Sequence, residues 1–122
     1  MSAVIWLDSK EARIFEFSLD HMEHHRLDEK HVEHHTHHPD GLDHQKWERE
    51  FFGRLGKNLA SATRLLIVGP GVAKHHFQNY LTEHLPELGR KIVACETVDH
   101  PTDGEIAAIA RTTFKLPGVR IM

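Results

Sequence analysis

The chain has 122 residues, of which 39% are hydrophobic and 27% charged, and its formal net charge is −3 when the 13 histidines are neutral. This length predicts one domain, spanning residues 1–122 and burying a single core. This charge gives no basic stripe, so we do not expect strong sequence-independent binding to nucleic acid near neutral pH. Protonation of the histidines would reverse the sign of the net charge.

The cysteine count and the N-terminal sequence bear on the cellular location of the protein. A single cysteine, Cys95, excludes an internal disulfide, and its apolar neighbours predict a small core residue rather than a reactive thiol. The run from Met1 to Trp6 has no basic region ahead of it and reaches Asp8 too soon for a signal peptide, and no apolar run approaches membrane-spanning length. We therefore expect a cytoplasmic protein without a membrane segment.

The first elements along the chain are short apolar strands. Residues 3–7 are apolar and end at a polar turn that begins with Asp8, and residues 12–18 resume with three large apolar side chains. This pattern predicts an antiparallel hairpin.

Histidine dominates the next part of the chain. The pattern His-x-Glu-His-His occurs at residues 21–25 and again at residues 31–35. We expect the first copy on a third strand that reaches about Leu27. The second copy opens a His-rich loop at about residues 28–42, where Pro39 and Gly41 exclude regular structure.

A helix should follow, with Asp43 as its N-cap and a large apolar residue at every fourth position: Trp47, Phe51, Leu55 and Leu59. Gly53 and Gly56 weaken this helix by up to ~1 kcal/mol each relative to alanine, so tertiary packing must hold it. Residues 65–68 show no polar alternation, which predicts a central strand covered on both faces.

The remaining elements alternate between helix and strand. Apolar residues from Phe77 to Leu85 predict a second helix that stops at Pro86 and the turn after it, and residues 91–98 predict the next strand. Thr102 begins a capping box for a third helix. The resulting order β-β-β-α-β-α-β-α predicts an α/β fold of ribonuclease H-like connectivity, with a mixed sheet flanked by helices. Its expected core includes Ile5, Phe51, Ile67, Phe77, Val93 and Ile109.

Two segments carry a resemblance to known proteins: Leu66-Ile67-Val68-Gly69-Pro70-Gly71-Val72-Ala73-Lys74 and Glu96-Thr97-Val98-Asp99-His100-Pro101-Thr102-Asp103-Gly104. Over nearly its whole length the chain resembles a family of small bacterial proteins known as translational machinery proteins. More remotely it is similar to the middle domain of archaeal and eukaryotic peptide-chain release factors and of Pelota-type ribosome rescue factors.

The release-factor resemblance implies a specific place for catalysis. In those factors, the loop between the third strand and the first helix carries Gly-Gly-Gln, which enters the ribosomal peptidyl transferase centre and helps to hydrolyse peptidyl-tRNA. Here that place holds residues 40–45, in which Gly41 and Gln45 are present but no glycine pair precedes the glutamine. The resemblance thus implies a translation-associated accessory protein without its own catalytic centre, binding ribosome, tRNA or a protein partner; self-association stays open.

Two enzymatic alternatives also stay open. One is peptidyl-tRNA hydrolysis. The other is a nuclease, because ribonuclease H-like enzymes hold two metal ions with carboxylates, for which Asp8 and Glu48 or Glu50 are candidates. No carboxylate follows the central strand, where such a site needs a ligand. Asp8 also fits a simple hairpin turn.

Two clusters near the ends of strands are candidate binding sites. Gly69 and Gly71 precede a helix and could hold an anion through backbone N–H groups, assisted by Lys74, or could simply form a tight turn. Asp99, His100 and Asp103 follow the next strand, on the carboxyl side where open α/β sheets bind ligands. Their structural alternative is a capped helix start.

The histidine segment is a candidate metal site. Nine of the 13 histidines lie between His21 and His44, interleaved with carboxylates. Imidazole with occasional carboxylate suits Zn²⁺ or another divalent transition metal, and alternate residues of an extended chain share a face. The alternative is a solvated loop that binds metal only adventitiously. The candidate ligands are His21, His25, His31, His35, His37 and His38.

Overall fold

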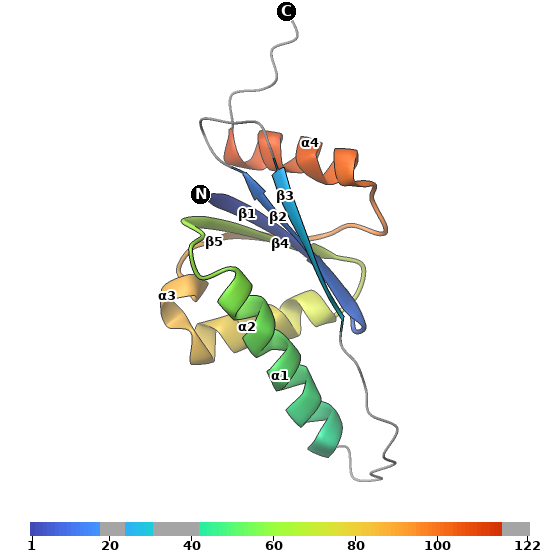
Figure 1. Ribbon diagram of the computed structural model, residues 1–122, viewed down its shortest axis with the longest axis vertical. Coiled ribbons are helices and arrows are strands. Elements are labelled where there is room, and N and C mark those ends of the chain that lie inside the picture. Colours follow the sequence, from blue (N-terminus) through green and yellow to red (C-terminus); the bar gives the residue numbers. More distant parts are fainter. Residues whose placement is uncertain (18–23, 31–41, 116–122) are drawn as a thin grey trace, which may run out of the picture.

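The computed structural model describes residues 1–17, 24–30 and 42–115 (Figure 1). The predicted order of elements is confirmed, with one addition. A four-residue helix, α3, occupies the place where only a turn was expected after Pro86. In chain order the elements are β1 (Ser2–Leu7), β2 (Glu11–Phe17), β3 (His24–Lys30), α1 (Leu42–Asn58), β4 (Arg64–Gly69), α2 (Ala73–His84), α3 (Pro86–Gly89), β5 (Ile92–Thr97) and α4 (Asp103–Phe114).

The five strands form one mixed sheet in the order β3-β2-β1-β4-β5. The pairs β1–β2 and β2–β3 are antiparallel, whereas β1–β4 and β4–β5 are parallel. The predicted fold class is therefore confirmed. The expected central strand, β4, lies inside the sheet between β1 and β5, and residues 65–69 of it are buried.

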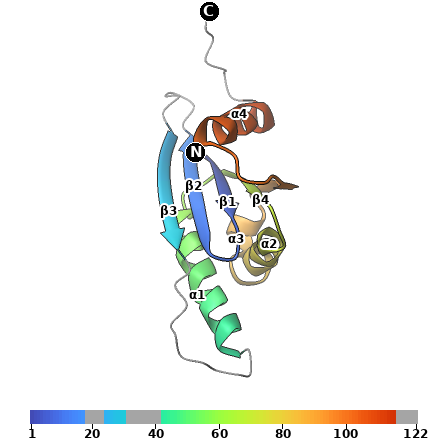
Figure 2. The same cartoon turned by 90° about the vertical axis from the view of Figure 1, so that its right-hand side faces the viewer.

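Helices cover both faces of this sheet (Figures 1 and 2). On one face, α1 and α2 pack against Ile5 and Leu7 of β1, and on the other face α4 packs against Val4 and Trp6. Successive residues of a strand point to opposite faces of the sheet. Because helices cover both faces, every residue of β1 is buried. None of the helices in the described part of the chain is long and apolar enough to cross a membrane.

Most of the predicted core is confirmed, and one member is wrong. Ile109 is only partly buried and packs against the α4 side of the sheet. Val93 is 49% exposed. It lies on the edge strand β5, where the pairing register shifts from Leu65–Ile92 to Leu66–Ala94 and leaves Val93 unpaired with β4. The confirmed members, all fully buried, are Ile5, Phe51, Ile67 and Phe77.

Two predicted boundaries also change. β3 continues to Lys30, beyond the expected end near Leu27, because its pairing with β2 extends as far as Glu11. α1 begins at Leu42, so Asp43, the expected N-cap, lies inside the helix. The second histidine copy, residues 31–35, lies outside the described residues.

The glycines of α1 face α2, which explains their place in a helix. A Cβ on Gly56 would lie 2.5 Å from Cδ1 of Leu85, and one on Gly53 would lie 3.5 Å from the Tyr80 hydroxyl. The absence of side chains lets the two helices approach closely. The helix propensity lost at these positions is thus linked to the packing between α1 and α2.

Candidate functional site

The Gly-Pro-Gly turn after β4 is held by contacts within the protein. A Cβ on Gly69 would lie 2.1 Å from the carbonyl oxygen of Leu7, so this close approach of β1 requires glycine. Lys74 is buried, and its Nζ donates a hydrogen bond of 2.5 Å to the carbonyl oxygen of Gly71. The lysine therefore stabilises the turn, and the anion site stays a prediction.

Asp99 and His100 lie beside the end of β1. The buried indole N–H of Trp6 donates to the carbonyl oxygen of Asp99 at 2.8 Å, and the His100 ring packs on Trp6 with centroids 5.2 Å apart. His100 Nδ1 lies 2.8 Å from Oδ1 of Asp99. These contacts connect the loop after β5 to β1.

Asp103, the first residue of α4, accepts hydrogen bonds from two arginines of the hairpin strands. The Nη1 atoms of Arg13 and Arg26 lie 3.1 Å and 2.7 Å from its two carboxylate oxygens. Arg26 also bonds Asp28, and these hydrogen bonds, with Asp28 first and Asp103 second, raise the pKa of its guanidinium. We refer to Trp6, Arg13, Asp99, His100 and Asp103 together as the carboxyl-edge cluster.

The start of α4 confirms the predicted capping box. Thr102 Oγ1 accepts from the backbone N–H of Glu105 at 3.2 Å, and the Glu105 carboxylate accepts from the backbone N–H of Thr102 at 3.1 Å. The backbone hydrogen bond, followed by the hydroxyl, holds the pKa of Glu105 below its ordinary value. The polar groups here thus have partners within the protein.

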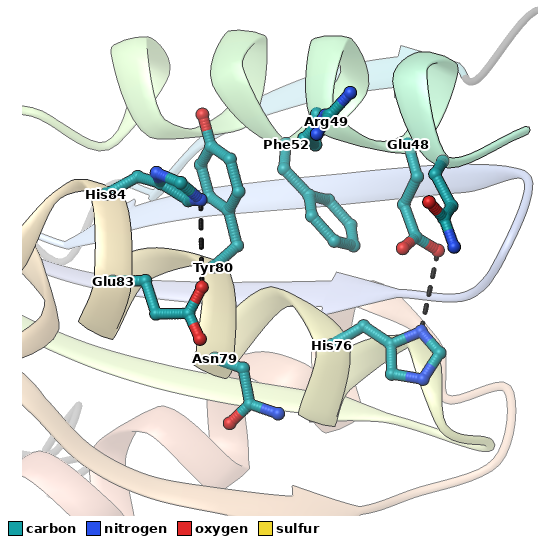
Figure 3. A pocket seen from close by; sticks show the side chains of 9 residues that line it. Glu48, Arg49, Phe52, His76, Asn79, Tyr80, Glu83 and His84 are labelled. Carbon is teal, nitrogen blue, oxygen red and sulfur yellow. Dashed lines mark ion pairs between the residues drawn. The ribbon is translucent and has the colours of Figure 1, made fainter. Parts of the chain in front are cut away.

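A second polar region lies between α1 and α2, on the opposite face of the sheet from α4. Its side chains recur at intervals of three and four along both helices, the spacing that places them on one helix face. A groove of ≈ 380 Å³ lies between the two helices. Figure 3 shows Glu48 and Phe52 of α1 on one side of it and His76 and Tyr80 of α2 on the other. The groove is lined by Gln45, Glu48, Arg49, Phe52, His76, Asn79, Tyr80, Glu83 and His84.

Aromatic rings form the floor of this α1–α2 groove. Phe52 is buried and packs against Tyr80 with ring centroids 5.6 Å apart, and Tyr80 packs in turn against His84 at 4.8 Å. Across the groove, Nδ1 of His76 lies 3.5 Å from Oε2 of Glu48 (Figure 3). This contact is an ion pair only when the histidine is protonated.

Three polar side chains of the groove have no hydrogen-bond partner among the residues that the structure describes. Gln45, Arg49 and Asn79 are exposed, and within the described part of the chain none of their side chains makes a hydrogen bond. Together they offer two primary amides and one guanidinium. Groups of this kind can recognise a polar planar ligand by donating and accepting hydrogen bonds.

The sequence predicts a small core residue at Cys95, whereas in the structure this residue is only partly buried. It packs against the core, and this burial raises the pKa of its thiol, with Lys74 and Glu96 as opposing smaller influences. Its Sγ lies 3.8 Å from Nδ1 of His75. A thiol that keeps its proton at neutral pH is a poor nucleophile.

Almost all of the predicted metal ligands lie outside the part of the chain that the structure describes. His21, His31, His35, His37 and His38 lie outside the described residues, as does Gly41, and for His25 only the backbone position in β3 is described. Within residues 1–17, 24–30 and 42–115, no group of three or more metal-ligating side chains occurs. Metal binding by the histidine segment stays a prediction.

The nuclease alternative loses one of its candidate residues to a structural role. The Asp8 carboxylate accepts hydrogen bonds of 2.8 Å from the backbone N–H groups of Lys10 and Glu11, as a hairpin turn requires. Glu48 instead faces His76 in the α1–α2 groove.

The α1–α2 groove was not predicted from the sequence, although polar residues recurring at helical spacing in both α1 and α2 could have indicated it.

Comparison by sequence relates the chain to Pelota. No protein-family profile matches it. It is 31% identical over 72 residues to the pelota homolog of Pyrococcus furiosus, covering 54% of this chain and 20% of that protein. The pelota homolog of Thermococcus gammatolerans is 31% identical over 77 residues, covering 58% and 22%. The chain thus spans about a fifth of the length of the curated relatives it matches.

Comparison by structure extends over almost the whole chain. Archaeoglobus fulgidus Pelota matches with a TM-score of 0.65 at 18% identity, over 93% of this chain and 32% of its own. Thermoplasma acidophilum Pelota gives 0.61 at 18% identity, over 94% and 34%. The archaeal translation termination factor aRF1 gives 0.53 at 16% identity, again over 94% and 34%. The predicted remote resemblance is confirmed: the chain is similar in sequence to Pelota and has the fold of one part of Pelota and of aRF1.

Proposed function

We propose that this chain acts in translation as an accessory protein that binds the ribosome. The observation that carries the proposal is the fold shared with Pelota and a translation termination factor over at least 93% of the chain, together with the sequence similarity to Pelota. Fold alone does not determine function, so the proposal requires a direct test. A ribosome-bound role is consistent with the expected cytoplasmic location.

We also propose that the chain does not itself release peptides. Its segment Asp40-Gly41-Leu42-Asp43-His44-Gln45 lacks the glycine pair of Gly-Gly-Gln, and Gln45 is part of α1, where it lines the α1–α2 groove. Peptidyl-tRNA on ribosomes should therefore remain intact when the protein is added. Release that disappears in Gln45→Ala would contradict this proposal.

The decisive test is sedimentation of the purified protein with ribosomes through a sucrose cushion. The protein should pellet with ribosomes and remain in the supernatant without them. Separate subunits and free tRNA, added in parallel, identify the binding partner. If the protein stays in the supernatant with excess ribosomes, ribosome binding is wrong; a complex with free tRNA or with another protein would then replace it.

A further inference from the structure

The α1–α2 groove combines ring surfaces with unpaired hydrogen-bonding groups. The Tyr80 ring is partly exposed and packs on the buried Phe52, and the His84 ring that packs on Tyr80 is 53% exposed. Single-stranded RNA is recognised by stacking its bases on such rings and by hydrogen bonds to the base edges. The rings alone would suit many apolar ligands, so the polar groups decide the ligand class.

The polar groups favour a nucleobase over an anion or a metal ion. Gln45 and Asn79 each supply a donor and an acceptor, as base edges do. Two carboxylates, Glu48 and Glu83, against the single guanidinium of Arg49 disfavour a bare anion. A metal ion lacks ligands here, since no three metal-ligating side chains gather in the described residues.

We propose that the groove between α1 and α2 binds one unpaired base of single-stranded RNA. This inference rests on the proposed function, because a ribosome-bound protein meets unpaired RNA bases. The base stacks on Tyr80 and His84 while Gln45 and Asn79 bond its edge.

The carboxylates of the groove predict a preference among bases. Glu48 and Glu83 accept hydrogen bonds, and adenine, cytosine and guanine carry an exocyclic amino group that uracil lacks. RNA rich in adenine should therefore bind more tightly than RNA rich in uracil. Arg49 is the one arginine or lysine among the residues that line the groove. For a single phosphate contact, the logarithm of affinity should fall with the logarithm of salt concentration with a slope of about −0.7.

The test measures fluorescence anisotropy of labelled short oligo(A) and oligo(U) with the intact protein. Oligo(A) should bind more tightly, and the double variant Gln45→Ala/Asn79→Ala should weaken its binding about tenfold or more. Gln78→Ala removes an amide from α2 outside the groove and is the matched control, expected to bind as the parent does. Equal affinity of parent and double variant for oligo(A), or no preference for oligo(A) over oligo(U), would overturn the inference.

The same variants in the ribosome sedimentation assay separate the two proposals. If the parent pellets with ribosomes and the double variant shows unchanged oligo(A) affinity, the groove assignment fails and the proposed function stands. If oligo(A) binding depends on the groove while the parent does not pellet, the groove assignment stands and the proposed function fails. Displacement of the RNA by a peptide that itself binds through Gln45 and Asn79 would overturn the assignment of an RNA base.

Discussion

The carboxyl-edge cluster and the α1–α2 groove are both rich in polar side chains, but they use them differently. At the edge, Asp103 bonds two arginines and the Trp6 indole bonds the Asp99 carbonyl. In the groove, Gln45 and Asn79 have no partner among the described residues. Polar groups that satisfy one another stabilise a fold, whereas unpaired exposed groups beside aromatic rings can recognise a ligand.

The largest loss of stability should follow a substitution of Gly69, the last residue of β4. Gly69→Ala places a Cβ against the backbone carbonyl of Leu7, which cannot rotate away as a side chain could. We expect the free energy of unfolding, measured in urea, to fall by about 3 kcal/mol. Gly71→Ala is the matched control, because nothing lies within 4 Å of its added Cβ. Equal stability of the two variants would contradict the described packing.

The next effect concerns the arginine at the centre of the carboxyl-edge cluster. Arg13→Met removes the bonds to Asp103 and to the carbonyl oxygen of Pro101, and the packing of the guanidinium over Trp6 at 4.8 Å. Because the Arg13 side chain is only 15% exposed, we expect a loss of about 2 kcal/mol in the free energy of unfolding. Oligo(A) affinity should be unchanged. A variant as stable as the parent would show that the cluster does not stabilise the fold.

Substitutions in the α1–α2 groove should have little effect on the stability of the fold. Gln45→Ala and Asn79→Ala remove exposed side chains without a described partner, so each should change the free energy of unfolding by no more than about 0.5 kcal/mol. Thermal and urea unfolding measure this directly. A loss above about 1 kcal/mol in either variant would mean that the side chain holds the fold together and is not free for a ligand.

The smallest effect is the pH dependence of the α4 capping box. Its lowered pKa means that Glu105 binds a proton less tightly in the folded chain than in the unfolded chain. Its carboxylate therefore stabilises the fold above its ordinary pKa of 4.5, and this contribution disappears as pH falls through the folded-state value. The parent should be more stable than Glu105→Gln at neutral pH, and the difference should vanish in strong acid. A difference that persists in strong acid would contradict this cause.

The elements of the fold could be predicted because their signals are local. The apolar run of residues 65–68 and the capping box at Thr102 each depend on neighbours in sequence, and both were correct. The exposure of Val93 could not be predicted, because it depends on how β5 pairs with β4. Local patterns do not determine register shifts at a sheet edge.

In both polar regions, the contacts between residues distant in sequence could not be predicted. Asp99, His100 and Asp103 lie within one short segment between β5 and the start of α4, so their proximity follows from the sequence itself. Their partners were not predicted, because Arg13 lies 90 residues from Asp103 in sequence. The α1–α2 groove depends on the relative placement of two helices, to which the packing of Gly56 against Leu85 contributes. The sequence pattern indicates which face of each helix is polar, but it does not show that these two faces meet.

The central claim is that recognition takes place in the α1–α2 groove and not at the carboxyl edge. Backbone amide chemical shifts, recorded by NMR while oligo(A) is added to the intact protein, test it most directly. We predict that the shifts which change belong to residues 45–52 of α1 and 76–84 of α2, with those of Asp99, His100 and Asp103 unmoved. Changes centred on the carboxyl-edge cluster, with the groove unaffected, would contradict the account.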